Sequence, residues 1–305
     1  MSEQAFLRRL CPCCGSWAGE MEMESRRVAE HLPLSQLRPL WAGLDKEPVF
    51  FSYRRCANCG LLYNPVYFTG RALADLYSEL APNMNMVPRS MIEATQRGYF
   101  DAIARSGALG GDYLEIGPDV GHMTADAARR GSFRHFWLYE PNRAVHSLLR
   151  KAAGTEAVTL ESGMDDLSAV PENTVGLAVM VHVLDHLLDP LPLLTQIRAR
   201  LRPGGMLAIV THNEGSLLRR VLGRKWPPFC LQHPQLFSPV TMKAMLERAG
   251  LERVEVTGSS NQFPSDFLVR QGAQAVGLPL GKVPLPSFPV RLPLGNILTL
   301  ARAPG

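Results

Sequence analysis

The chain has 305 residues, of which 46% are hydrophobic and 20% charged, and its formal net charge is +4. A disordered or low-complexity chain would be poorer in apolar residues and richer in charge, so that class is excluded. The near balance of 32 basic and 28 acidic residues, without a basic run, counts weakly against a nucleic-acid partner. No stretch reaches the ~20 apolar residues of a membrane helix, and the N-terminal residues do not resemble a secretory signal. We therefore expect a cytoplasmic protein without a membrane partner.

Three regions follow one another along the chain. Residues 1–68 are polar and rich in turns, and we expect them to form a small domain. Residues 69–106 read as a helical connector, interrupted at Pro82 and Pro88. Residues 107–305 alternate short apolar runs with amphipathic helices, a pattern typical of βαβ units. The sequence therefore predicts an α/β main domain with a doubly wound, mostly parallel sheet of seven strands.

The apolar runs place the elements of this domain. The predicted strands are Tyr113–Ile116, Phe136–Tyr139, Ala157–Leu160, Val175–Val181, Met206–Thr211, Leu251–Thr257 and Asn296–Ala301. The predicted helices are Met123–Arg130, Arg143–Ala153, Pro192–Leu201 and Val240–Ala249. Residues 261–295, which include a proline-rich stretch, are expected to be an irregular insertion before the last strand.

Two cysteine pairs share the form Cys-x-x-Cys-Gly, with Cys11 and Cys14 in the first and Cys56 and Cys59 in the second. Four thiolates on two tight turns form a closed tetrahedral Zn²⁺ site, and clustered cysteines in a cytosolic chain favour metal over disulfides. We expect a zinc ribbon whose ion is structural, with a ribbon that also touches substrate as the alternative. Cys13 is spare, because only Cys11 and Cys14 reproduce the spacing of the second pair.

A glycine-rich turn follows the first predicted strand. Gly117 permits a tight turn, and Gly121 permits close approach to the next helix. Glu140 ends the second strand, where an acid accepts hydrogen bonds from ribose hydroxyls. Asp119 would repel a pyrophosphate, so a ligand with ribose but no phosphate fits better. S-adenosylmethionine is such a ligand, and its ammonium group would suit Glu115 or Asp119.

From this turn onward the sequence resembles the class I S-adenosylmethionine-dependent methyltransferases, with a Rossmann-like fold. The resemblance covers roughly residues 107–260 and rests on five ordered blocks, LEIGPDVG, YEPN, SGMDDL, VMVHVLDHLLDP and LRPGGMLAIVTHN. The later segments SLLRRVLGRKW and QHPQLFSPVTM are similar to a bacterial subgroup with an N-terminal cysteine ribbon, many of whose members act on sugars or other small metabolites. Asp119 departs from the glycine usual in the family, and Gly163 from aspartate.

The resemblance implies a set of cofactor-binding residues. Glu115, Gly117 and Gly121 would line the methionine end, with Asp119 in the same loop. Glu140 would bind the ribose, and Met164 with Asp165 the adenine, although Met164 also fits a core position. His182, in the apolar run of the fourth strand, is a further candidate for the cofactor site and fits a core position better.

Histidines near the strand ends are candidates for a catalytic base, because histidine titrates near neutral pH. We place His233 first, since its loop could close over the acceptor, and His212 second. His186 belongs to a block shared by methyltransferases of many substrates and is expected to shape the site. A reaction without a base remains an alternative.

The sequence therefore predicts an enzyme that methylates a small molecule, such as a sugar or a secondary or cell-surface metabolite. A ribosomal RNA methyltransferase with a zinc ribbon is the first alternative. The second is a non-catalytic scaffold that binds a partner through the ribbon. Nothing in the sequence indicates an oligomeric state.

Overall fold

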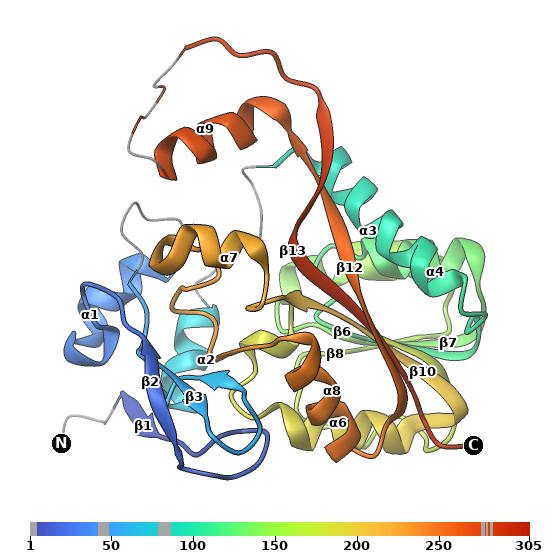
Figure 1. Cartoon of the computed structure of the whole chain (residues 1–305). Coiled ribbons are helices and arrows are strands. Elements are labelled where there is room, and N and C mark those ends of the chain that lie inside the picture. Colours follow the sequence, from blue (N-terminus) through green and yellow to red (C-terminus); the bar gives the residue numbers. More distant parts are fainter. Residues whose placement is uncertain (1–4, 42–48, 79–86, 276–277, 279, 281–282) are drawn as a thin grey trace.

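The computed structural model describes residues 5–41, 49–78, 87–275, 278, 280 and 283–305, and its centre is a seven-stranded sheet (Figure 1). The strand order is β12-β13-β10-β9-β6-β7-β8. The strands are β6 (Gly110–Ile116), β7 (Ser132–Tyr139), β8 (Val158–Glu161), β9 (Val175–Val181), β10 (Leu201–His212), β12 (Glu252–Pro264) and β13 (Pro289–Arg302). Only β13 runs against its neighbours β10 and β12. The predicted α/β fold with a mostly parallel seven-stranded sheet is confirmed.

Helices cover both faces of the sheet and enclose two separate cores. On one face lie α3 (Arg89–Ala104), α4 (His122–Arg130) and α5 (His146–Ala153), and on the other lie α6 (Pro190–Arg200) and α8 (Pro239–Arg248). Alternate residues of one strand serve the two cores, as Tyr113 and Leu114 of β6 show. Strands buried on both faces read as continuous apolar runs, which is why the sequence revealed them.

The expectation for residues 261–295 is wrong in part. Strand β12 continues to Pro264, α9 (Ser265–Ala275) follows, and β13 already begins at Pro289. The two strands stay paired beyond the sheet, and the resulting ribbon carries α9 at its far end (Figure 1). Proline is tolerated there because each strand of a two-stranded ribbon has a free edge. Residues 276–277, 279 and 281–282 of this stretch lie outside the described residues.

The N-terminal region contains small sheets, as expected for a ribbon. Strand β1 (Phe6–Arg8) pairs with β5 (Val66–Phe68), and a second sheet has the order β11-β4-β3-β2. Its strands are β2 (Gly19–Met23), β3 (Tyr53–Cys56), β4 (Leu62–Tyr63) and β11 (Gln235–Leu236). Strand β11 comes from the loop after β10, so the main domain supplies one strand of the N-terminal sheet. The division at residue 68 remains a prediction.

The N-terminal region contains an aromatic core, which its description as polar and turn-rich did not predict. Trp41, Phe51, Tyr67 and Phe68 are buried together, and their rings pack edge to face or tilted at centroid distances of 4.8–5.6 Å. Short helices α1 (Leu34–Leu37), η1 (Ala29–His31) and η2 (Arg38–Leu40) cover it, with α2 (Gly70–Ser78). These aromatic side chains escape a periodicity reading because they come from short segments that lie apart in the sequence.

The connector contains α2 and α3 as expected, and the predicted break at Pro82 lies outside the described residues. The remaining elements are α7 (Leu217–Leu222), η3 (Arg143–Val145), η4 (Leu184–His186) and η5 (Gly223–Lys225). Within the described residues, the length and apolarity that a membrane-spanning helix requires are not met by any helix.

Candidate active site and cysteine cluster

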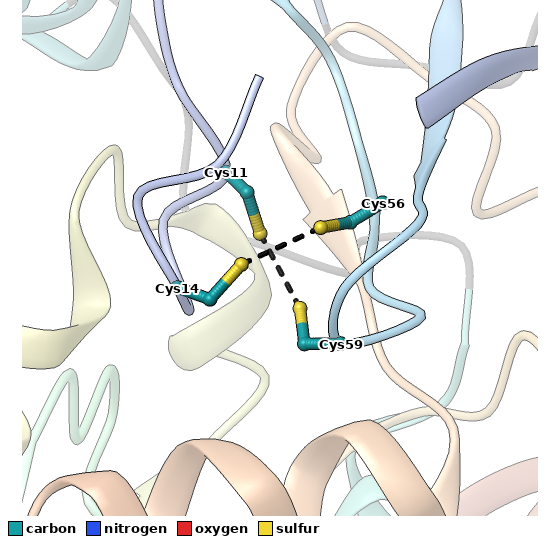
Figure 2. A group of neighbouring side chains, drawn as sticks. All are labelled: Cys11, Cys14, Cys56 and Cys59. Atoms are coloured by element: carbon teal, nitrogen blue, oxygen red, sulfur yellow. Dashed lines mark hydrogen bonds between the residues drawn. The ribbon is translucent and has the colours of Figure 1, made fainter. Parts of the chain in front are cut away.

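The four cysteines of the two Cys-x-x-Cys-Gly turns converge on one point (Figure 2). The Sγ atoms of Cys11 and Cys59 lie 3.5 Å apart, and those of Cys14 and Cys56 lie 3.4 Å apart. With Zn–S bonds of about 2.3 Å, a tetrahedral site has sulfur–sulfur distances of about 3.8 Å, so a small expansion admits the ion. The donor set fits zinc. Cys13 is buried but is not one of the four.

The glycine-rich turn connects β6 to α4 through left-handed backbone. Gly117 has a φ of 67° and Gly121 a φ of 82°. A Cβ on Gly117 would lie 2.6 Å from Cγ2 of Val183, so the turn packs directly against the exit of β9. Asp119 also adopts a positive φ, of 50°, a conformation that glycine adopts without the steric cost that a side chain brings.

Glu140 ties this turn to the end of β7. Its Oε2 accepts a hydrogen bond of 2.9 Å from the backbone N–H of Asp119, and its Oε1 one of 2.8 Å from that of Asn142. Burial raises the pKa of Glu140, and the two backbone N–H groups oppose this shift. Each oxygen keeps a further lone pair, so the carboxylate can accept from ribose hydroxyls beside the loop.

Glu115 lies deeper and is held by two hydroxyl groups. Its Oε2 accepts from Tyr113 at 2.8 Å and from Thr124 at 2.5 Å, which anchors α4 to β6. Burial raises the pKa of Glu115 to about 7, although these hydroxyls favour the ionised form. A contact between Glu115 and the methionine end of the cofactor remains a prediction.

The adenine candidates lie in the loop after β8. Met164 is half-buried against the core that contains α6 and α8. Asp165 is exposed, and its carbonyl accepts a 2.8 Å hydrogen bond from the Gln196 side chain on α6. The loop after β8 is therefore attached to α6. The side chain of Asp165 lies at the surface of the protein, and that of Met164 lies partly below it.

Four histidines gather where β9 and β10 end. The ring centroids of His182 and His212 are 4.6 Å apart, those of His212 and His233 are 5.1 Å apart, and those of His186 and His233 are 4.6 Å apart. The sequence predicted histidines near these strand ends, and the structure brings all four into one cluster. The sequence analysis did not identify Asp185, a fully buried carboxylate on η4 in the centre of the cluster. The only available signal was its position between two of the histidines.

Hydrogen bonds assign the proton of His212. Nδ1 of His212 lies 3.0 Å from Oδ1 of Asn296, and Nδ2 of Asn296 donates to His182 and Asn261. The amide is therefore oriented with its oxygen toward His212, so Nδ1 of His212 carries the proton and Nε2 carries the lone pair. His182, with a φ of 52°, accepts at Nε2, and its buried Nδ1 has no partner within the described residues.

The other two histidines face each other. Nδ1 of His233 donates to the Pro228 carbonyl at 2.7 Å and lies 3.3 Å from Sγ of Cys230. Nε2 of His233 lies 3.2 Å from Nε2 of His186, whose Nδ1 lies 3.2 Å from the Tyr77 hydroxyl. Cys230 thus lies beside the histidine cluster.

Burial and mutual interactions shift the pKa values of the residues in the histidine cluster. Burial alone would lower the pKa of His233, but Cys230, Asp185 and the Pro228 carbonyl raise it to about 9. Burial and the neighbouring His233 lower the pKa of His186 to about 3, and burial also lowers that of His212. The pKa of Asp185 is lowered despite burial, because the surrounding histidines favour the carboxylate.

The loop that carries His233 is attached to the N-terminal region. The hydroxyls of Tyr53 and Tyr67 donate to the carbonyls of His233 and Leu231, each at 2.6 Å. Arg9 donates to the side chain of Gln235 at 2.9 Å. The N-terminal region therefore determines where this loop lies.

Comparison with known proteins identifies the class that this fold and site define, the S-adenosylmethionine-dependent methyltransferases of class I. A family model described as a methyltransferase domain matches residues 89–256. Because this match spans more than half of the chain, the chain belongs to the methyltransferase-domain family. The family implies S-adenosylmethionine as the cofactor, and the glycine turn with Glu140 fits its ribose.

Curated relatives share the same catalytic domain at low identity. The ubiquinone biosynthesis O-methyltransferase of Cupriavidus pinatubonensis is 26% identical over 197 residues, covering 60% of this chain and 78% of that protein. The protein of the same name from Nitrosospira multiformis is 24% identical over 187 residues, covering 59% and 77%. The chain is thus a distant relative of these enzymes.

Solved structures confirm the fold. A chain from the complex of the Haloferax volcanii Trm112 methyltransferase activator with a methyltransferase superposes with a TM-score of 0.53 and 16% identity, covering 71% of this chain and 93% of that chain. The YcgJ protein of Bacillus subtilis superposes with a TM-score of 0.50 and 15% identity, covering 68% and 99%.

The cysteine cluster predicts one thiolate-bound zinc. Metal analysis should show that a Cys56→Ser/Cys59→Ser variant loses one equivalent of zinc relative to the wild type, because two of four ligands are removed. Cys230→Ser is the matched control and should keep this equivalent. An unchanged zinc content in the double variant would remove these cysteines from the site.

Glu140 predicts how the cofactor is held. Glu140→Ala should weaken S-adenosylmethionine binding by about 2–3 kcal/mol, the range for losing hydrogen bonds to a charged group. Glu140→Gln, which keeps one acceptor oxygen, should lose less, and the exposed Glu156→Ala should bind like the wild type. Calorimetry measures all three, and wild-type affinity in Glu140→Ala would show that this acid does not face the ribose.

Proposed function

We propose that the protein transfers a methyl group from S-adenosylmethionine to a hydroxyl oxygen of a small molecule, with His212 as the general base. The observation that supports this most is the orientation of His212, whose Nδ1 is held by Asn296 while Nε2 keeps its lone pair. His212 ends β10, at the edge of the sheet where doubly wound folds bind their ligands. The curated relatives are O-methyltransferases, which supports oxygen over nitrogen or carbon as the acceptor.

The chemistry needs little from the protein beyond alignment and a proton acceptor. The sulfonium of the cofactor supplies an activated methyl group. The chain's own residues would hold the cofactor at the glycine turn and Glu140, and would orient the acceptor hydroxyl against His212. As the oxygen forms its bond to carbon, Nε2 of His212 takes the hydroxyl proton, and Asn296 stabilises the imidazolium through Nδ1.

His212 suits this role better than His233, which the sequence placed first. Nδ1 of His233 is committed to the Pro228 carbonyl, and its Nε2 faces His186. Both ring nitrogens of His233 therefore already have partners, whereas Nε2 of His212 keeps its lone pair. The lowered pKa of His212 keeps it neutral. We therefore assign His233 and His186 to the shaping of the acceptor site.

The same assay tests the two alternatives, a ribosomal RNA methyltransferase and a non-catalytic scaffold. A ribosomal RNA substrate has weak support, because charge is nearly balanced and the relatives are named for ubiquinone biosynthesis. A sugar or a secondary or cell-surface metabolite remains compatible with an oxygen acceptor. Membership of a methyltransferase family favours an enzyme over a non-catalytic scaffold.

The test is methyl transfer from labelled S-adenosylmethionine to a panel of small phenols, nucleotide sugars and bulk RNA. With the accepted substrate, His212→Ala should lower turnover by about 10²–10⁴ while cofactor affinity stays unchanged, as expected for loss of a general base. Asn296→Ala should also lower turnover, because His212 can then carry its proton on Nε2, and this tautomer cannot accept the hydroxyl proton there. The exposed His31→Ala is the control.

Two outcomes would contradict the proposal. Near-normal turnover in His212→Ala would remove this residue from proton transfer. Label that appears only in RNA would favour the RNA methyltransferase.

A further inference from the structure

We propose that Asp185, His186 and His233 form a second metal site, for a divalent transition cation such as Zn²⁺, separate from the cysteine cluster. One ligand atom from each of these residues lies within 4.8 Å of the other two. Two imidazoles and one carboxylate are a donor set that binds such cations and leaves further coordination positions open.

The two imidazoles have the spacing of ligands on one ion. Their Nε2 atoms lie 3.2 Å apart, and with metal–nitrogen bonds of about 2.0–2.1 Å this corresponds to a ligand–metal–ligand angle of about 100°. Without an ion, one of the two atoms must carry a proton that the other accepts. With an ion, both lone pairs bind it.

The carboxylate supplies an independent observation. Asp185 has 0% exposure, and its Oδ1 has no hydrogen-bond partner within the described residues. A buried, unpartnered carboxylate oxygen is costly, because it has lost its hydration without replacement. A cation between Asp185 and the two imidazoles would remove this cost.

The outer nitrogens of both imidazoles already have partners. Nδ1 of His233 donates to the Pro228 carbonyl, and Nδ1 of His186 lies 3.2 Å from the hydroxyl of Tyr77. Metal-binding histidines characteristically have such partners, which fix the ring and direct the second nitrogen toward the ion. Three separate elements, α2, η4 and the loop after β10, contribute these contacts.

The other two histidines of the cluster are both held by Asn296. Asn296 occupies Nδ1 of His212 and Nε2 of His182. The ring of His212 lies 5.1 Å from that of His233, so the proposed base would be a neighbour of the proposed ion. If the proposed function is right, the ion would bind the acceptor oxygen next to the base that deprotonates it.

The test counts metal and does not depend on methyl transfer. Protein stripped and reconstituted with Zn²⁺ should contain two equivalents in the wild type and one in His186→Ala or Asp185→Asn. The exposed His31→Ala is the matched control and should keep two. Tyr77→Phe preserves all ligands, and it should weaken Zn²⁺ binding at this site about 10-fold by releasing His186.

Spectroscopy separates this site from the cysteine cluster. Co²⁺ added to protein with one equivalent of zinc should give visible d–d bands without a thiolate charge-transfer band, and His186→Ala should lose them. One equivalent of metal in the wild type would overturn the proposal. Two equivalents in both the wild type and His186→Ala would also overturn it, since the second ion would lie elsewhere.

The separate activity assay keeps the two proposals apart. A wild type that binds two ions but methylates no hydroxyl acceptor would leave the metal site standing and contradict the proposed function. Methyl transfer by protein that binds only the cysteine-bound ion would support the proposed function and contradict the second metal site.

Discussion

The attachment of the loop after β10 to the N-terminal region is the constraint on which the histidine cluster of this protein depends. Strand β11 of that loop pairs with β4, and Tyr53 holds the carbonyl of His233 from the neighbouring strand β3. Cys56 ends β3, so the cysteine cluster lies at the end of the strand that positions the loop. The cysteine cluster and the position of His233 are therefore linked through a few residues of one small sheet.

A charged network strengthens the same attachment. Arg55 pairs with Glu22 on β2 and with Glu214, which follows β10, at 2.6 Å each. Glu214 is buried, so its pair with Arg55 is screened less than a surface salt bridge, and Arg219 lies 3.7 Å from the same carboxylate. The N-terminal region is thus fastened to the main domain by a strand, by tyrosine hydroxyls and by an ion pair.

The two halves of the proposed site, a cofactor side and an acceptor side, are built on different principles. The cofactor side uses backbone geometry, in which left-handed residues and Glu140 shape a turn at the ends of β6 and β7. The acceptor side uses side chains from distant segments, which meet around a buried carboxylate. Such a design fits an enzyme family that keeps its methyl donor while its acceptor differs, because only the second half needs to change.

What the sequence could predict follows from this difference. Strand β9 was predicted with its observed bounds, Val175–Val181, since buried parallel strands are continuous apolar runs. The cysteine turns were visible because their four ligands repeat one local motif. Asn296 and Tyr77 could not be found, because they reach the histidines from β13 and α2 through tertiary packing alone. The pairing of β11 with β4 was hidden for the same reason, since a two-residue strand has no periodicity.

The link between the cysteine cluster and the loop after β10 can be measured directly by amide hydrogen exchange, before and after the protein is treated with a zinc chelator. Our account predicts faster exchange in residues 226–237, while the amides of β6 and β9 keep their protection because helices cover both faces of the sheet. Unchanged protection of residues 226–237 after the zinc is removed would contradict the claim that the cysteine cluster holds this loop in place.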